Sequence, residues 1–274
     1  MNGTVAAAVF CDPPYNLRAR AIGGRGRVRH PDFAVASGEM HPGQFREFLS
    51  ETLGNSLRVS SEGAVHFVCM DWRHVGDLIE VGRELYGSML NLVVWNKTNA
   101  GQGSFYRSQH ELIGVFRVGG RQHQNNVELG RYGRNRSNVW TYPGVNTFGR
   151  GRMDALAIHP TVKPIALVAD ALLDCTSRGD VVVDQFAGVG TTILAAEKVG
   201  RVAYAIEYEP RYVDAALGRW QQMTKLEAVL TGDGRTFEEI KEDRINSSDD
   251  FDSRRTSADV TASIGCQRRT RRSR

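Results

Sequence analysis

The sequence predicts an α/β protein whose core is a doubly wound, mainly parallel sheet. Short apolar runs rich in β-branched residues alternate along the chain with segments whose apolar residues recur every three or four positions. Strands joined by helices in this way build a parallel sheet covered on both faces. With 274 residues, 41% hydrophobic and 24% charged, the chain suits one large globular domain and not a disordered or fibrous protein.

The first half alternates predicted strands at residues 5–11, 64–70, 90–95 and 111–118 with helices at 42–57 and 75–86. The first strand ends at Asp12-Pro13-Pro14, because proline cannot donate a hydrogen bond to a sheet. Residues 18–38, 97–110 and 119–153 have no apolar period and are therefore predicted loops.

The second half predicts helices at 164–175, 191–199 and 212–223, with strands at 180–184 and 201–206. Beyond residue 240 the sequence turns to Ser, Asp, Arg and Thr, which predicts a disordered tail at 241–274. We therefore divide the chain into two halves of one domain, 1–97 and 153–240, separated by an irregular insertion at 98–152.

The net charge of +4 is modest, but its distribution indicates a polyanionic partner. Residues 16–31 contain five arginines and no acid, and residues 97–152 contain nine Lys or Arg against two acids. Loops of this kind are expected to contact phosphates. The candidate phosphate-contacting residues are Arg25, Arg27, Arg29, Lys97, Arg107, Arg131, Arg134 and Arg136.

Cysteine spacing and apolar run length narrow the class of protein further. The four cysteines show no C-x-x-C or Cys/His spacing, so we expect reduced, mostly buried thiols and no metal site. Apolar runs are shorter than the roughly 20 residues of a membrane span, and the first residues do not resemble a secretion signal. The expected location is the cytoplasm.

A glycine turn follows the predicted strand that ends at Asp184. Gly188 and Gly190 lie between this strand and a helix, where backbone N–H groups can approach a ligand. No lysine follows Gly190, which excludes a phosphate loop, and the third glycine of a dinucleotide fingerprint is missing. Glu207 ends the next strand, where an acid can accept both ribose hydroxyls. A structural turn beside a solvated acid explains these two features equally well.

Asp12-Pro13-Pro14-Tyr15-Asn16 forms a second candidate site at a strand end. A carboxylate followed by prolines makes a cluster of hydrogen-bond acceptors beside an aromatic ring, which suits a planar NH₂ group. Taken alone, the same residues also fit a rigid turn.

Together, the Asp12-Pro13-Pro14-Tyr15 tetrad, the turn after Asp184 and the segment His159-Pro160-Thr161-Val162-Lys163-Pro164 resemble the S-adenosylmethionine-dependent DNA amino-methyltransferases. The tetrad comes first in the chain and the glycine turn comes last. This order of the motifs resembles that of the circularly permuted beta class of the family. Residues 95–97 and 109–113 are similar to the strands that flank its target-recognition region. The resemblance covers about residues 5–222 and implies a permuted Rossmann-like fold with a small, irregular recognition insertion at 98–152.

The resemblance also implies a role for each motif. The catalytic residues facing the target base would be Asp12, Pro13, Pro14 and Tyr15. Thr161, Lys163 and Pro164 would lie near the methionine end of S-adenosylmethionine, although a surface loop is the alternative for this segment. The full cofactor-binding set would be Asp184, Phe186, Gly188, Gly190, Thr191, Glu207, Thr161, Lys163 and Pro164.

The implied activity is methyl transfer to the 6-amino group of a flipped adenine in double-stranded DNA, as in restriction–modification, by a monomer or homodimer. Adenine is favoured because Asp at the first tetrad position is more typical of adenine enzymes in this family, and Ser of cytosine enzymes. The alternatives are a cytosine 4-amino methyltransferase and, because only about eleven residues precede Asp12, a non-catalytic DNA-binding remnant. A dehydrogenase is disfavoured by the missing third glycine and the basic loops.

Overall fold

The computed structural model describes residues 1–18, 35–101, 105–144, 162–246 and 264–265. Its core is an eight-stranded sheet in the order β5-β3-β4-β2-β1-β6-β7-β8. The strands are β1 (Ala6–Cys11), β2 (Ser60–Met70), β3 (Ser88–Asn96), β4 (His110–Arg117), β5 (Val139–Thr141), β6 (Val181–Asp184), β7 (Val202–Ala205) and β8 (Ile264–Gly265). The predicted α/β class with a doubly wound, mainly parallel sheet is confirmed.

Most strands of the sheet run in one direction. β1 pairs in parallel with β2 and β6, β6 with β7, and β3 with β5. β4 lies antiparallel between β2 and β3, so β3 keeps the direction of β2, and β8 opposes β7. The carboxyl ends of β1, β3, β5, β6 and β7 therefore share one edge with the start of β4. We call this the carboxyl edge.

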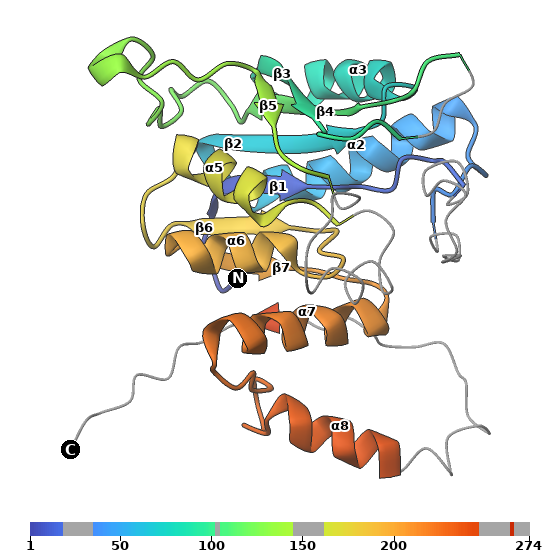
Figure 1. Cartoon of the computed structure of the whole chain (residues 1–274), viewed down its shortest axis with the longest axis vertical. Coiled ribbons are helices and arrows are strands. Elements are labelled where there is room, and N and C mark those ends of the chain that lie inside the picture. The colour runs from blue at the N-terminus through green and yellow to red at the C-terminus, as the bar shows by residue number, and fades with distance from the viewer. Residues whose placement is uncertain (19–34, 102–104, 145–161, 247–263, 266–274) are drawn as a thin grey trace.

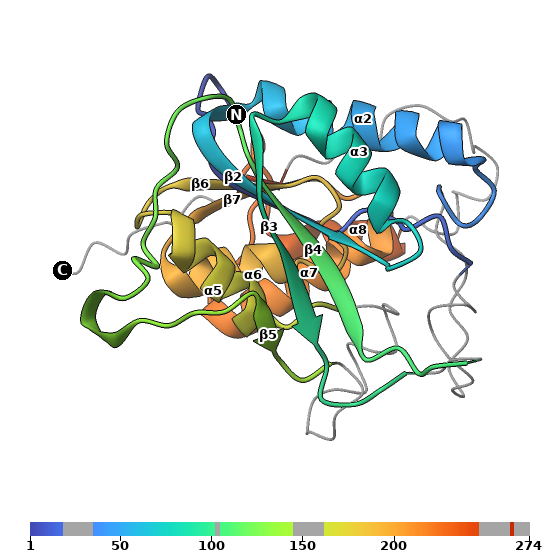
Figure 2. The same cartoon turned by 90° about the horizontal axis from the view of Figure 1, so that it is seen from above.

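Helices cover both faces of the sheet (Figures 1 and 2). The helices α2 (Pro42–Arg58) and α3 (Val75–Leu85) lie on one face, and α5 (Ile165–Cys175), α6 (Thr191–Val199) and α7 (Pro210–Thr224) lie on the other. α2 begins at Pro42, whose missing N–H costs nothing in a first turn, and buries Phe45, Leu49 and Leu53. Buried strand residues such as Val9 and Val182 complete the core between these layers.

The structure adds three elements that the sequence did not predict. β5 lies within the expected loop 119–153, and α8 (Phe237–Asn246) and β8 lie partly or wholly within the expected tail. The predicted start of disorder at residue 241 is therefore wrong. Thr236 and Glu239 exchange hydrogen bonds in a capping box, which stabilises the start of α8 despite its polar composition. Residues 247–263 and 266–274 of the tail lie outside the described residues.

The cysteines Cys11, Cys69 and Cys175 are free and buried, and Cys266 lies outside the described residues. Within the described ranges, no helix combines the length and hydropathy needed to cross a membrane.

Phe116 of β4 packs between two glycines. Its ring stacks on Tyr86 at 4.8 Å between centroids, and a Cβ at Gly114 would lie 2.6 Å from its Cε2 atom. A Cβ at Gly82 of α3 would overlap the same ring from the other side. The ring therefore has no room to move away from an added methyl group.

We expect Gly82→Ala to lower the free energy of unfolding by about 1–3 kcal/mol through overpacking. The matched control is Gly54→Ala in α2, where an added Cβ meets no atom within 4 Å, and this variant should gain about 0.5–1 kcal/mol. Urea denaturation of the three proteins measures both effects. Equal stability of the two variants would contradict the packing described for Phe116.

Candidate active site

Charged side chains from distant parts of the sequence meet at the carboxyl edge of the sheet. Asp12 follows β1, Lys97 follows β3, Asp184 ends β6, and Glu207 follows β7. Glu111 joins them because β4 runs antiparallel, which places its first residues at this edge. Open parallel sheets bind their ligands at such an edge.

The turn after β1 is set by Pro13, Pro14 and Asn16. Asn16 adopts a left-handed conformation with φ of 53°, which asparagine tolerates better than most residues. Its side chain donates to the carbonyl of Met40 at 2.8 Å and accepts the N–H of Gly38 at 3.0 Å. The buried amide thus fixes the direction in which Asp12 and Tyr15 leave the strand.

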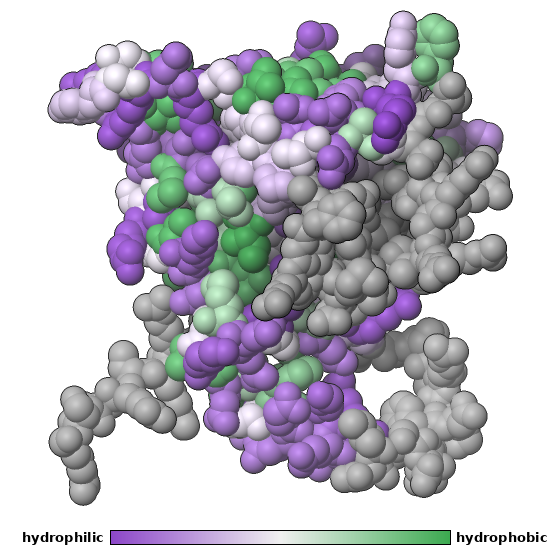
Figure 3. All heavy atoms as spheres, viewed as in Figure 1, coloured by the Kyte–Doolittle hydropathy of each residue, from purple (hydrophilic) through white to green (hydrophobic). Residues whose placement is uncertain are grey.

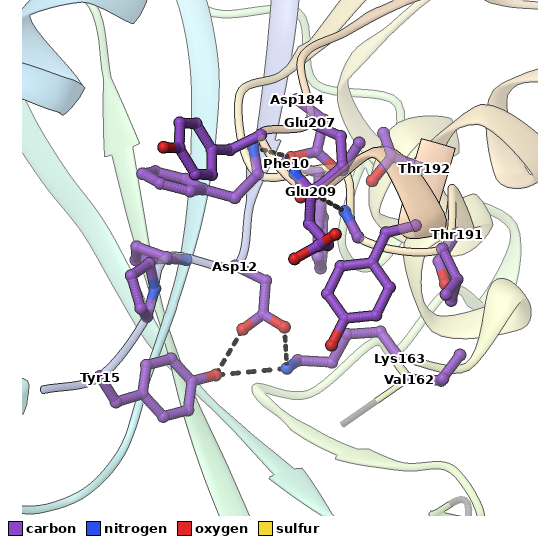
Figure 4. Close-up of a pocket in the computed structure, with 18 of the residues that line it drawn as sticks. Phe10, Asp12, Tyr15, Val162, Lys163, Asp184, Thr191, Thr192, Glu207 and Glu209 are labelled. Carbon is purple, nitrogen blue, oxygen red and sulfur yellow. Dashed lines mark hydrogen bonds and ion pairs between the residues drawn. The ribbon is translucent and has the colours of Figure 1, made fainter. Parts of the chain in front are cut away.

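Lys163 joins two carboxylates beneath this turn. Its Nζ lies 2.5 Å from Oδ2 of Asp12 and 3.0 Å from Oε2 of Glu111, and Lys97 binds the other oxygen of Glu111 at 2.5 Å. Tyr15 donates its hydroxyl hydrogen to Oδ1 of Asp12 at 2.6 Å and accepts from Lys163 at 3.2 Å. Figure 4 shows Asp12, Tyr15 and Lys163 pointing toward one another across the cavity floor.

The two carboxylates of this network differ in pKa. Burial raises the pKa of Asp12, and the charge of Glu111 adds to the rise, although Lys163 opposes both. Burial acts in the same direction on Glu111, but Lys163 and Lys97 together lower its pKa to about 2. Burial lowers the pKa of Lys163, but Asp12 and Glu111 outweigh it and raise the pKa above its ordinary value. Asp12 is therefore the carboxylate better suited to exchange a proton.

The glycine turn after β6 is held by Glu207. One carboxylate oxygen accepts the N–H of Gly188 at 2.7 Å, and the other accepts the N–H of Glu209 at 2.8 Å. Each oxygen retains a second lone pair, so the carboxylate can still accept hydroxyl groups of a ligand.

Asp184 lies buried beneath the same turn. It accepts the N–H of Phe186 at 3.0 Å. Burial raises the pKa of its carboxyl to about 7, although hydrogen bonds from Thr192 and Phe186 oppose the shift. Near neutral pH this carboxyl therefore carries a proton in a substantial fraction of molecules.

A cavity of about 300 Å³ connects the Asp12 turn with the glycine turn. Asp12 and Lys163 lie at one end and Glu207 at the other, with apolar and aromatic side chains between them (Figure 4). The tetrad and most of the predicted cofactor residues thus line a single cavity.

The structure brings together most of the residues predicted for the site. The cavity is lined by Asp12, Pro13, Pro14, Tyr15, Lys163, Asp184, Phe186, Gly188, Thr191 and Glu207. Gly190 does not line it, because this glycine has φ of 78° and its Cα faces α7, where an added Cβ would lie 2.7 Å from Cβ of Ala216. Pro164 serves as the residue before α5, and Thr161 lies outside the described residues.

Sequence reasoning missed Glu111 as a site residue and assigned Lys97 to DNA. The structure instead pairs these two side chains beside the cavity floor. A glutamate at the start of an otherwise apolar strand was the available signal, but its meaning depends on the antiparallel direction of β4. Tyr208, Glu209, Arg211 and Tyr212 also line the cavity without having been predicted.

Those of the predicted DNA-contacting residues that the structure describes lie near two different edges of the sheet. Arg107 binds the carbonyls of Ala100 and Gly101 next to the carboxyl edge. The segment after β4 begins at the opposite edge, where it is tied to the C-terminal end of α5 (Figure 1). Arg131 and Arg134 there pair with Glu128, and Arg136 pairs with Asp174 at 2.7 Å. Arg25, Arg27 and Arg29 lie outside the described residues.

The insertion predicted at 98–152 is therefore not one structural unit. β4 divides it into a part beside the cavity and a part that begins at the far edge of the sheet and returns to the carboxyl edge through β5. The placement of Arg131, Arg134 and Arg136 does not support a shared DNA contact with Asp12.

Comparison with known proteins links this geometry to one family. The profile of a family described as DNA methylase matches residues 6–218. The Type II methyltransferase M.HpaI of Haemophilus parainfluenzae is 24% identical over 77% of this chain and 67% of its own length. The Type II methyltransferase M2.MboI of Moraxella bovis is 22% identical over 79% of this chain and 81% of its own.

Solved structures share the fold. The PvuII DNA methyltransferase, described as cytosine-N4-specific, superposes with a TM-score of 0.62 at 15% identity over 89% of this chain and 86% of its own. The TTHA0409 protein of Thermus thermophilus, described as a putative DNA modification methylase complexed with S-adenosyl-L-methionine, gives 0.55 at 20% identity over 80% of this chain and 86% of its own.

The buried Asp184 predicts a specific dependence of stability on pH. Its pKa is about 7 in the folded protein and about 3.9 in an unfolded chain. Between these values the folded state holds a proton that the unfolded state has lost, so its contribution to stability falls as pH rises. Asp184→Asn removes this titration but keeps an acceptor for Phe186.

Between pH 5 and pH 8, titration of Asp184 should lower the free energy of unfolding of the wild-type protein by up to about 2–3 kcal/mol. Asp184→Asn lacks this titration, so we expect its free energy of unfolding to fall by that much less over the same range. Urea denaturation of both proteins at the two pH values provides the measurement. Parallel pH profiles for the wild-type protein and Asp184→Asn would show that Asp184 titrates normally.

Proposed function

We propose that this chain, which belongs to the DNA methylase family, transfers a methyl group from S-adenosyl-L-methionine to the 6-amino group of adenine in double-stranded DNA. The observation that carries the proposal is the single cavity with Asp12 at one end and Glu207 at the other. A two-substrate transfer needs both partners in one enclosed space, with the reacting atoms in line.

The Glu207 end of the cavity fits the methyl donor. The carboxylate of Glu207 keeps acceptor capacity for ribose hydroxyls, and the backbone of Gly188 leaves space that a side chain would fill. The rings of Phe186 and Phe48, 6.1 Å apart, supply apolar surface for a purine. When bound, S-adenosyl-L-methionine supplies the electrophilic methyl group.

The Asp12 end of the cavity fits the acceptor amine. The lone pair of an exocyclic amine is delocalised into the ring, which makes the nitrogen a weak nucleophile. A carboxylate that accepts its N–H favours a tetrahedral nitrogen and restores the lone pair. Asp12 can play this role, with the carbonyl of Pro13 as a second acceptor, while Lys163 and Tyr15 hold the carboxylate in place.

The proton released from the amine also favours Asp12 over Glu111. Methyl transfer forms a bond from nitrogen to carbon, breaks the sulfur–carbon bond and leaves an excess proton on nitrogen. A carboxyl with a raised pKa accepts this proton more readily than one with a pKa of about 2. Glu111 and Lys97 then act as positioning residues that fix Lys163.

The target base must leave the DNA helix to reach this cavity, because a stacked base does not expose its amine to a buried carboxylate. Tyr15 lies beside Asp12 and offers an aromatic face for the extruded base. The Type II methyltransferases among the relatives support a place in restriction–modification.

Adenine is our choice because Asp, not Ser, begins the tetrad. The likeness to the PvuII enzyme keeps cytosine N4 as the second candidate, although at 15% identity it supports the fold alone. The order of the motifs, with the tetrad in the first half and the glycine turn in the second, supports the permuted beta class.

Two variants separate the ends of the cavity. Asp12→Asn should lower methyl transfer by at least about tenfold, because it loses a charge-assisted hydrogen bond of about 1.5–3 kcal/mol, while S-adenosylhomocysteine affinity stays within a few-fold. Glu207→Ala should weaken S-adenosylhomocysteine binding by about tenfold or more. Glu207 is a cleaner test than Gly190, whose substitution would also disturb α7.

Calorimetry with S-adenosylhomocysteine and tritium transfer to unmethylated DNA measure the two effects. A wild-type protein that binds DNA but not S-adenosylhomocysteine would instead be a non-catalytic remnant. Equal loss of both properties in Asp12→Asn would move Asp12 into the donor site.

A further inference from the structure

The connection between β3 and β4 forms a short paired arm at the carboxyl edge. The N–H of Lys97 donates to the carbonyl of Gln109 at 2.8 Å, and that of Gly101 donates to the carbonyl of Ser108 at 2.7 Å. Arg107 crosses the pair and binds the carbonyls of Ala100 and Gly101. Residues 97–101 and 105–109 therefore hold each other in a fixed arrangement.

Two aromatic side chains stand at the outer end of this arm. Phe105 is 84% exposed and Tyr106 is 80% exposed, whereas most large hydrophobic side chains of the described residues are buried or half-buried. Their ring centroids lie 4.3 Å apart in an edge-to-face arrangement. Exposing two adjacent rings costs hydration free energy, so a partner that covers them would recover it.

The arm begins beside the catalytic carboxylate. At its base, Lys97 pairs with Glu111, which shares Lys163 with Asp12. Residues 97–101 and 105–109 project outward from the sheet (Figures 1 and 2), and the coloured atoms at the upper right of Figure 3 protrude from the surface. Phe105 is four residues from Gln109, so it reaches at most about 13 Å beyond the base pairing. This upper limit is larger than the depth of either DNA groove, about 8 Å.

We propose that Phe105 and Tyr106 contact the base stack of duplex DNA at the target site and stabilise the helix from which the target base has been extruded. This inference rests on the proposed function. Extrusion leaves a gap and an unpaired partner base, and an aromatic ring can stack on the exposed bases at that position.

The composition of the arm favours DNA as the occupant. Residues 97–110 contain Lys97 and Arg107 and no acid. Lys97 is paired with Glu111 at the base, and Arg107 follows directly after Tyr106, so a cation adjoins the aromatic pair in the chain and suits a polyanion. Stacking accepts any base, which assigns the arm to extrusion of the target and not to reading of the sequence.

The test uses short duplexes that contain the target site, located by sequencing the modified positions in DNA treated with the wild-type protein. We expect the double variant Phe105→Ala/Tyr106→Ala to transfer methyl groups about tenfold more slowly to the matched duplex. On a duplex in which the target base lies opposite an abasic position, extrusion costs less, and the rate should return to within about threefold of wild type. S-adenosylhomocysteine affinity should be unchanged.

The matched control is Tyr132→Ala, which removes an aromatic ring that is 88% exposed in the segment at the opposite edge. It should match wild type on both duplexes. A double variant that transfers methyl groups at the wild-type rate would overturn the role of the arm, and so would an equal loss of rate on both duplexes. A change in self-association of the protein without an effect on DNA methylation would overturn it as well. Absence of wild-type methyl transfer to any DNA would refute the proposed function itself and the arm with it.

Discussion

The ion pairs of Lys163 with Asp12 and Glu111 are the interaction on which the site depends. Lys163 comes from the second half of the chain, Asp12 from the first and Glu111 from the segment between them, so these contacts join three parts of the chain at the cavity floor. All three groups are largely withdrawn from water, and removing one partner from a buried pair costs about 3–5 kcal/mol. The lysine therefore holds Asp12 in one position, and its charge opposes the rise in the pKa of Asp12 that burial causes.

The direction of the strands explains why these residues meet. β1 pairs in parallel with β2 and β6, and β6 with β7, so their carboxyl ends lie along one edge. The antiparallel β4 gives β3 the direction of β2 and itself returns to this edge with Glu111. Along this edge the charges differ in kind. The charges of Asp12 and Glu111 are balanced by lysines, and the carboxylate of Glu207 accepts hydrogen bonds from backbone N–H groups. The pKa of Asp184 is raised to about 7. One cavity thus offers a site for a charged donor beside a site for an amine.

Local patterns in the sequence were sufficient to predict most elements and both turns that line the cavity. Asp12-Pro13-Pro14 and the glycines after Asp184 are short-range signals, because prolines and glycines act on the backbone where they stand. Glu111 could not be predicted, since its place depends on the direction of β4. The sequence could not predict the positions of Arg131, Arg134 and Arg136 for a similar reason. Only the path of the chain after β4 shows that they lie at the far edge. Gly190 makes room for α7, a packing role that depends on tertiary structure and that the glycine turn alone does not predict.

The most direct measurement of the central claim is transfer of a tritiated methyl group from S-adenosyl-L-methionine to unmethylated duplex DNA, followed by nucleoside analysis. The account predicts that the label appears in N6-methyladenine and requires the carboxylate of Asp12. Label in N4-methylcytosine would contradict the choice of base but keep the mechanism at Asp12. DNA that remains unlabelled, with a protein shown to bind the donor, would contradict the assignment of this cavity to amine methylation.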